Sequence, residues 1–311
     1  MIGSVLFLVL GLVLLLIGSN LLVTSTERFS SAYSISGFTA SFFIIGIATS
    51  APEISIAIES ALQNETILAL GNSIGSNISN IALVFCLSVF FIKHEDKVMT
   101  LPKNMYTAMI ALTLCLFILI FTDHIFDAID ALILLIVFLI VLFYLAREEQ
   151  KSDSYYEESP KSFGLLKISI LSILGVLMLI YGSAYFIDGA TQIAILFGIS
   201  SYTIGLTLTA LGTSLPELAS SIQSARKDRT DFIIGNIIGS NIFNIAIAAS
   251  AAGLINSAIV NKTEFIRDIS VLLTVSIVFY MIVKSDKTLR KTLYSSILVI
   301  TYFVYIFFIF G

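Results

Sequence analysis

The chain has few charged residues and few of the side chains that bind soft metals. Only 12% of its 311 residues are charged and 57% are hydrophobic, whereas a typical soluble domain carries about 25% charged residues. Its two cysteines, Cys86 and Cys115, lie in separate apolar segments and support no disulfide framework. The net charge of −4 gives no sign of a nucleic-acid partner. With a mean hydropathy of +1.00, the composition indicates an integral membrane protein whose main partner is the lipid bilayer.

Long apolar segments recur along the whole sequence, and each is close to the ~20 residues needed to cross ~30 Å of hydrocarbon. They cover residues 4–25, 38–61, 67–92, 104–122, 126–146, 163–188, 201–225, 231–256, 266–284 and 290–310. The first segment lacks a basic leader and a clear cleavage site, so we interpret it as a span and not as a signal peptide. The sequence therefore predicts an all-α membrane protein with ten transmembrane helices.

The two halves of the sequence are copies of each other. Residues 46–84 and 210–248 align without a gap at an offset of 164, with 18 identities in 39 positions. Such self-similarity indicates a tandem duplication. We expect a first five-helix repeat over residues 1–146 and a second over 163–311, joined by a cytoplasmic linker at 147–162.

The basic residues predict how the chain crosses the membrane. If the N-terminus lies outside the cell, 15 of the 17 Lys and Arg residues fall on the cytoplasmic side, as the positive-inside rule requires. Both termini are then extracellular, and the location is the cell membrane. Because each repeat has five helices, an odd number, the second repeat crosses the bilayer in the opposite direction to the first. The predicted fold is therefore two inverted five-helix repeats, the plan of many secondary transporters.

Each repeat carries a glutamate beside a proline within an apolar segment, Glu53 after Pro52 and Glu217 after Pro216. Because proline removes a backbone donor, we expect helices that are broken at the membrane midplane. Thr49 and Ser50 precede Glu53 by four and three residues, as Thr213 and Ser214 precede Glu217, so helical spacing places them on one face. In the following span of each repeat, polar residues recur every four positions and form a polar stripe, and we expect inverted symmetry to bring the stripes together at the midplane. These stripes are Asn72, Ser76 and Asn80 in the first repeat, and Asn236, Ser240 and Asn244 in the second.

Carboxylate, hydroxyl, amide and carbonyl oxygens are the ligands that Ca²⁺ and other hard cations prefer. His94 and His124 are expected in loops, and the duplicated segments 46–84 and 210–248 carry no cysteine, which argues against zinc or copper. Two charged carboxylates without a bound cation are costly in a dry, occluded site. A carrier with a cation bound should therefore reorient more readily than one without. This predicts coupled exchange, with either Na⁺ or H⁺ as the counter-ion.

The paired motifs resemble the two alpha-repeats of the cation/Ca²⁺ exchanger superfamily, and they are most similar to prokaryotic Na⁺/Ca²⁺ exchangers. The first half carries G-I-A-T-S-A-P-E and G-N-S-I-G-S-N-I-S-N, and the second carries A-L-G-T-S-L-P-E and G-N-I-I-G-S-N-I-F-N. The resemblance implies a central Ca²⁺ site flanked by Na⁺ sites, with Glu53 and Glu217 bridging them. Further implied ligands are Thr49, Ser50, Ser76, Asn80, Thr213, Ser214, Ser240 and Asn244, with the carbonyl oxygens of Gly46 and Ala210.

The resemblance also implies a mode of transport. Some relatives carry an aspartate at the position of Asn244, and an acid there is linked to K⁺ co-transport, so the asparagine implies K⁺ independence. About three Na⁺ would exchange for one Ca²⁺, with net charge movement. The first and sixth helices would slide against the rest in alternating access. Ca²⁺ and Na⁺ are then transported substrates, no cofactor is expected, and one chain suffices as a functional monomer because it holds both half-sites.

Four other classes of protein are alternatives to this interpretation. An H⁺/Ca²⁺ exchanger of the same superfamily would use the same glutamates as proton acceptors. A membrane-embedded enzyme could use the glutamate pair, but the sequence shows no recognisable nucleophile triad. A cation channel fits a closed carboxylate pair less well than an occluding carrier does. A primary pump is disfavoured because the sequence has no G-x-x-x-x-G-K-[ST] loop.

Overall fold

The computed structural model describes residues 2–92, 99, 101–149, 164–198, 210–285 and 288–310. Most of the predicted linker, residues 150–162, and the start of one predicted span, residues 201–209, lie outside the described residues. Within them the chain is almost entirely helical. Two short strands, β1 (Ile125–Phe126) and β2 (Ala258–Ile259), pair antiparallel at the ends of neighbouring helices.

The helices follow the predicted apolar segments. In the first half they are α1 (Ile2–Tyr33), α2 (Gly37–Ala40), η1 (Ser41–Ile45), α3 (Gly46–Thr49), α4 (Ala51–Leu62), α5 (Thr66–Ser79), η2 (Asn80–Phe85), α6 (Cys86–Val89), α7 (Lys103–Asp123) and α8 (Ala128–Glu149). In the second half they are α9 (Leu165–Leu196), α11 (Ala210–Thr213), α12 (Leu215–Arg226), α13 (Thr230–Phe243), η4 (Asn244–Ala249), α14 (Ser250–Ile255), α15 (Lys262–Lys284) and α16 (Thr288–Phe310).

Seven helices within the described part are long and apolar enough to cross a membrane, and a bent pair would make eight. The bent pair is Gly37–Thr49 with Ala51–Leu62, at an angle of 42°. The apolar part of α8, Ala128–Phe143, is shorter than a full span, and the predicted span 201–225 is described only from residue 210. The all-helical membrane architecture is confirmed, while the count of ten helices stays a prediction.

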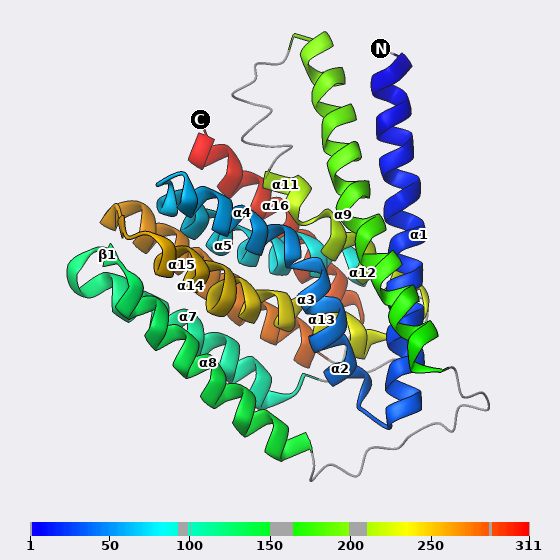
Figure 1. The fold of residues 1–311 in the computed structure, drawn as a ribbon, viewed down its shortest axis with the longest axis horizontal. Coiled ribbons are helices and arrows are strands. Elements are labelled where there is room, and N and C mark those ends of the chain that lie inside the picture. Colours follow the sequence, from blue (N-terminus) through cyan, green and yellow to red (C-terminus); the bar gives the residue numbers. More distant parts are fainter. Residues whose placement is uncertain are drawn as a thin grey trace.

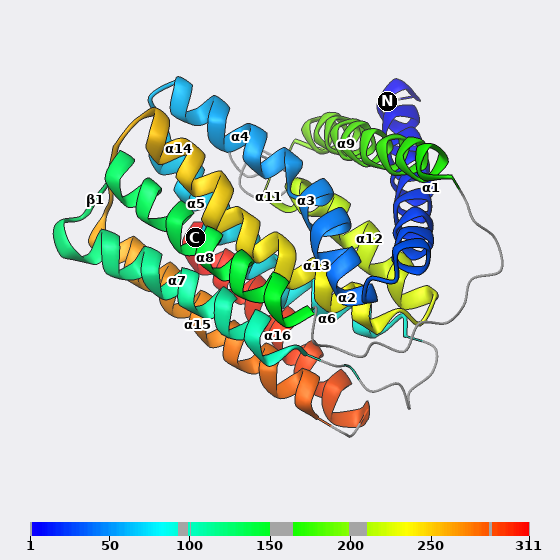
Figure 2. The ribbon, with the colours of Figure 1, turned by 60° about the horizontal axis from the view of Figure 1, so that its bottom comes forward.

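Helices α1 and α9 lie side by side along one edge of the molecule (Figures 1 and 2). They run antiparallel, since Gly11 meets Gly182 and Gly18 meets Gly175. A Cβ atom at Gly11 would lie 2.4 Å from the backbone nitrogen of Phe186. The absence of side chains at these glycines therefore lets the two backbones approach closely, as in other membrane helix pairs.

The segment from α13 to α14 forms the centre of the molecule. Its apolar window, Thr230–Ile255, is 94% buried inside the protein, whereas that of α1 is 28% buried. Gly235 and Gly239 of α13 pack against the backbone of α2, η1 and α3, at Phe38, Phe42 and Gly46 respectively, as the spacing G-x-x-x-G predicts. A Cβ atom at the equivalent Gly71 or Gly75 would meet no atom of another element within 4 Å in the described part of the chain.

Two kinds of irregularity interrupt the central helices. The predicted breaks are confirmed: α3 ends at Thr49 and α11 at Thr213, and a proline lies in the first turn of each following helix, where its missing N–H is not needed. In addition, α5 and α13 continue into the π-helical turns η2 and η4 at the same offset of 164. Such π-helical turns often mark functional sites.

Candidate cation-binding site

Glu53 and Glu217 lie in the first turns of α4 and α12, immediately after the two breaks. Both side chains are fully buried at 0% exposure. All four carboxylate oxygens lack a hydrogen-bond partner in the described part of the chain, and the ion pairs found there involve neither residue. A buried, uncompensated carboxylate is costly, so this pair is suited to a bound cation.

The two repeats interlock around this glutamate pair. Ser76 is a side-chain neighbour of Glu53, while Thr49 and Ser240 are neighbours of Glu217. The segment η4 packs against α4, and η2 packs against α12. Glu217 therefore has polar neighbours from both halves of the sequence, and segments of both halves pack around Glu53, in agreement with the predicted convergence of the two repeats.

Thr49 connects the first break to α13. Its hydroxyl lies 3.1 Å from Oδ1 of Asn236, to which it donates, and 3.2 Å from the hydroxyl of Ser240. Ser240 in turn lies 3.4 Å from the carbonyl oxygen of Gly46, a predicted ligand. The amide of Asn236 donates to the hydroxyl of Ser221 at 2.9 Å. These contacts hold the broken end of α3 against the second repeat.

Four asparagines form a reciprocal network where α5 continues into η2 and α13 continues into η4. Nδ2 of Asn80 donates to Oδ1 of Asn241 at 3.1 Å, and Nδ2 of Asn244 donates to Oδ1 of Asn77 at 3.1 Å. Asn77 also donates to the carbonyl oxygen of Asn241 at 2.9 Å, and Asn241 to that of Asn77 at 3.3 Å. The network maps onto itself when each residue is exchanged for its copy 164 positions away.

Eight of the thirteen buried side-chain oxygens without a partner in the described part of the chain follow the same duplication. Oδ1 of Asn80 and of Asn244 has none, and neither do the hydroxyls of Ser50 and Ser214, which lie at the two breaks. Including the glutamates, eight unpartnered oxygens belong to three duplicated pairs. Thr213 ends α11 and is buried, while Ala210 begins that helix and its side chain is not described.

Three asparagines outside the predicted ligand set also belong to this cluster: Asn77, Asn241 and Asn236. Asn236 was expected in a polar stripe, but its contacts with Thr49 and Ser221 make it a partner of other side chains. Asn77 and Asn241 fall three residues before Asn80 and Asn244 in both copies of the motif G-S-N-I-x-N. That repeated pair of asparagines is the signal that could have identified them from the sequence.

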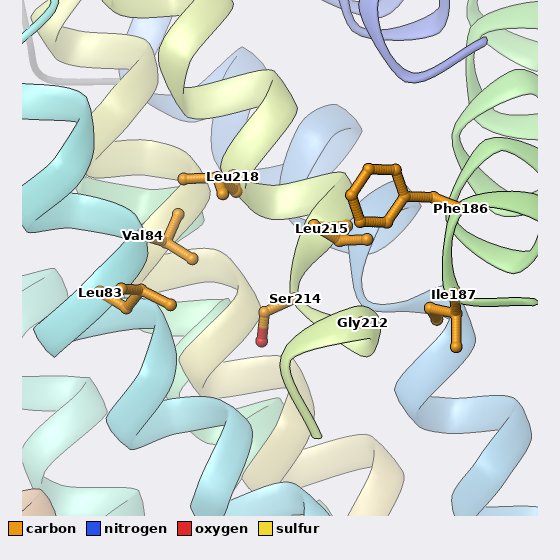
Figure 3. Close-up of a pocket in the computed structure, with 8 residues that line it drawn as sticks. All are labelled: Leu83, Val84, Phe186, Ile187, Gly212, Ser214, Leu215 and Leu218. Atoms are coloured by element: carbon orange, nitrogen blue, oxygen red, sulfur yellow. The ribbon is translucent and has the colours of Figure 1, made fainter. Parts of the chain in front are cut away.

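An apolar pocket reaches the second break (Figure 3). Its lining includes Phe186 and Ile187 of α9 and Leu215 of α12, and the hydroxyl of Ser214 provides a polar group among them. The pocket therefore lies between α9, η2 and the break that precedes α12.

The buried oxygen cluster between two broken helices, set in an all-helical membrane architecture, defines a multi-pass membrane transporter. The model of the family described as sodium/calcium exchanger protein matches residues 3–147 and again 167–311. The chain therefore belongs to the sodium/calcium exchanger family, as the motifs predicted.

Individual relatives resemble the chain over most of its length. Inner membrane protein YrbG of Escherichia coli is 32% identical over 88% of this chain and 87% of its own. Sodium/calcium exchanger MaX1 of Methanosarcina acetivorans is 24% identical over 92% and 93%. The solved structure of the sodium-calcium exchanger NCX_Mj soaked with 10 mM Na⁺ and 10 mM Sr²⁺ matches with a TM-score of 0.80 and 30% identity, covering 97% of each chain.

Proposed function

We propose that this protein is a Na⁺/Ca²⁺ antiporter that binds its cations between the two broken helices and works by alternating access. The observation that carries the proposal is the pair of fully buried glutamates, Glu53 and Glu217, whose oxygens have no partner in the described part of the chain. The family and the fold of NCX_Mj support the same function.

The donor set supports Ca²⁺ as one substrate. Ca²⁺ takes about 6–8 oxygen ligands, and the eight unpartnered oxygens of the three duplicated pairs offer that number. The proposed ligands are Glu53, Glu217, Ser50, Ser214, Thr49, Thr213, Ser76, Ser240, Asn80 and Asn244, with the carbonyls of Gly46 and Ala210. Two carboxylates supply a charge of about −2, which one Ca²⁺ or two or more Na⁺ would balance.

Two observations support the inverted repeat. The duplicated helices α1 and α9 run antiparallel, and the asparagine network is reciprocal at the offset of 164. On this plan ten helices cross the cell membrane, both termini are extracellular, and a single chain holds the complete site. The α1 and α9 pair, which packs mainly on itself, would move as a unit against the remaining helices.

The coupling follows from the charge of the site. With Asn244 in place of an acid, the site has no additional carboxylate for K⁺. About three Na⁺ would then exchange for each Ca²⁺, moving a net charge worth about 2.3 kcal/mol per 100 mV.

The proposal is tested by ⁴⁵Ca²⁺ uptake into proteoliposomes loaded with Na⁺ and diluted into Na⁺-free or Na⁺-equal medium, at fixed pH and clamped potential. We expect uptake only with an outward Na⁺ gradient, with no change when K⁺ is replaced by choline. Glu53→Gln should abolish uptake, whereas Glu59→Gln, at an exposed position of the same helix, should not.

Uptake that ignores Na⁺ but follows an imposed pH gradient would assign the protein to H⁺/Ca²⁺ exchange instead. Unchanged Ca²⁺ uptake in both Glu53→Gln and Glu217→Gln would overturn the shared central site. If uptake by the parent protein depends on Na⁺, the current recorded during exchange reports the stoichiometry. Exchange without a current would contradict electrogenic transport.

A further inference from the structure

The asparagines Asn80 and Asn244 each present an amide whose two ends differ in polarity. The Oδ1 end can bind a cation, whereas the NH₂ end carries partial positive charge and repels one. A free asparagine amide can turn through 180° and exchange these ends. The Oδ1 atoms of both residues are buried without a partner in the described part of the chain, while both NH₂ groups are engaged. The orientation that suits a cation is therefore the one present.

Asn77 and Asn241 determine this orientation. Oδ1 of Asn77 accepts from the NH₂ group of Asn244, and Oδ1 of Asn241 accepts from that of Asn80, each at 3.1 Å. A carbonyl oxygen can only accept, so a turned amide would place two oxygens against each other. Two buried oxygens would then face each other with no proton between them, which is unfavourable.

The two accepting oxygens are themselves held in place. The NH₂ group of Asn77 donates to the carbonyl oxygen of Asn241, and that of Asn241 to the carbonyl oxygen of Asn77, at 2.9 and 3.3 Å. Both side chains are 1% exposed, so water does not compete for these bonds. The two hydrogen bonds between Asn77 and Asn241 thus join the two repeats and fix both side chains.

We infer that Asn77 and Asn241 are positioning residues, which fix the Asn244 and Asn80 amides with Oδ1 directed to the transported cation. This inference rests on the proposed function, in which Asn80 and Asn244 are ligands. Each positioning residue accepts a hydrogen bond from the cation ligand of the opposite repeat: Asn77 from Asn244, and Asn241 from Asn80. Both half-sites are therefore coupled through one hydrogen-bonded unit.

The test uses equilibrium ⁴⁵Ca²⁺ binding to the purified full chain, which does not depend on the counter-ion. Asn77→Ala should raise the Ca²⁺ dissociation constant roughly 10- to 100-fold, as loss of a ligand-orienting partner does. In an Asn244→Asp background the same Asn77→Ala change should cause no loss, because a carboxylate has an oxygen at both ends and needs no orientation.

The matched control is Asn241→Ala in the same Asn244→Asp background. In this background Asn241→Ala should still raise the Ca²⁺ dissociation constant by the full factor, because Asn241 orients the amide of Asn80 and Asn80 is unchanged. A merely structural role predicts instead that Asn77→Ala weakens binding equally in the parent and in Asn244→Asp, and that result would overturn the inference.

A second variant covers the case in which Asn77→Ala fails to fold. Asn77→Asp keeps an accepting oxygen for the Asn244 amide and loses only the donor to Asn241, so Ca²⁺ affinity should be retained. A loss of affinity in Asn77→Asp would contradict the positioning role. Absence of Na⁺-driven uptake by the parent protein, with Ca²⁺ binding intact and sensitive to Asn77, would refute the proposed function alone.

Discussion

The hydroxyl groups of Thr49 and Ser240 lie 3.2 Å apart, although 191 residues separate them in the sequence. Thr49 also donates to Oδ1 of Asn236, and Ser240 donates to the carbonyl oxygen of Gly46, so the two hydroxyls belong to one connected chain of hydrogen bonds. The contact joins the broken end of α3 to α13 and lies beside Glu217. It is therefore a point where packing of the two repeats and cation binding meet.

Thr49→Val should separate these two effects. Valine keeps the shape of threonine but removes the hydroxyl, which leaves the buried Asn236 oxygen without its donor at a cost of about 1–3 kcal/mol. We expect a lower melting temperature and weaker Ca²⁺ binding. Thr49→Ser, which keeps the hydroxyl, is the control and should retain both. Equal Ca²⁺ affinity in the two variants would exclude Thr49 as a ligand.

Replacing a buried glutamate should stabilise the ion-free protein while removing transport. Glu53→Gln takes away one of two uncompensated carboxylates, so its melting temperature in chelator should exceed that of the parent. Added Ca²⁺ should raise the melting temperature of the parent by mass action but not that of the variant. Glu59→Gln should behave like the parent. A Ca²⁺-dependent shift that survives in both Glu53→Gln and Glu217→Gln would contradict the proposed site.

Much of this arrangement was predictable because it follows from local chemistry. Pro52 and Pro216 predict the two helix breaks, and a buried acid beside each predicts a site, since neither feature depends on a distant partner. The duplication adds that the two half-sites resemble each other. These expectations required only the covalent geometry of proline and the cost of a buried charge.

The asparagine network was not predictable in the same way. Helical spacing places Asn77 near the face that carries Asn80, but only the crossing of the two repeats brings Asn77 to Asn244. The π-helical turns η2 and η4 likewise depend on tertiary packing. The two repeats differ at one pair of equivalent asparagines, Asn236 and Asn72. Asn236 donates to Ser221, but the residue equivalent to Ser221 in the first repeat is Ala57, which has no hydroxyl. The Asn72 amide nitrogen accordingly has no partner among the described residues.

Close packing of α1 on α9 should depend on the glycines between them. A Cβ atom at Gly11 would lie within 2.7 Å of the Gly182 carbonyl oxygen, so Gly11→Val must push the helices apart. We expect impaired exchange and a lower melting temperature. Gly3→Val is the control on the same helix, because nothing lies within 4 Å of its Cβ position. Equal exchange rates in the two variants would show that close contact of α1 and α9 is not required.

An ion pair fixes the end of α1 to the turn between α12 and α13. Nζ of Lys227 lies 2.8 Å from Oε2 of Glu27 and donates to the Thr24 hydroxyl at 2.7 Å. At the equivalent positions of the other half stand Gln63, Thr191 and Asp188, which provide no cation to repeat this pair. The attachment is thus specific to one face of the molecule.

Reversing one charge should weaken this attachment, and reversing both should restore it. Because both side chains are about one quarter exposed, the pair contributes on the order of 0.2–1 kcal/mol. Glu27→Lys should therefore lower the melting temperature modestly and change the exchange rate, since α1 is less firmly held to the turn. Glu27→Lys combined with Lys227→Glu should return both values toward the parent. If the double variant is no closer to the parent than Glu27→Lys alone, the ion pair does not hold α1.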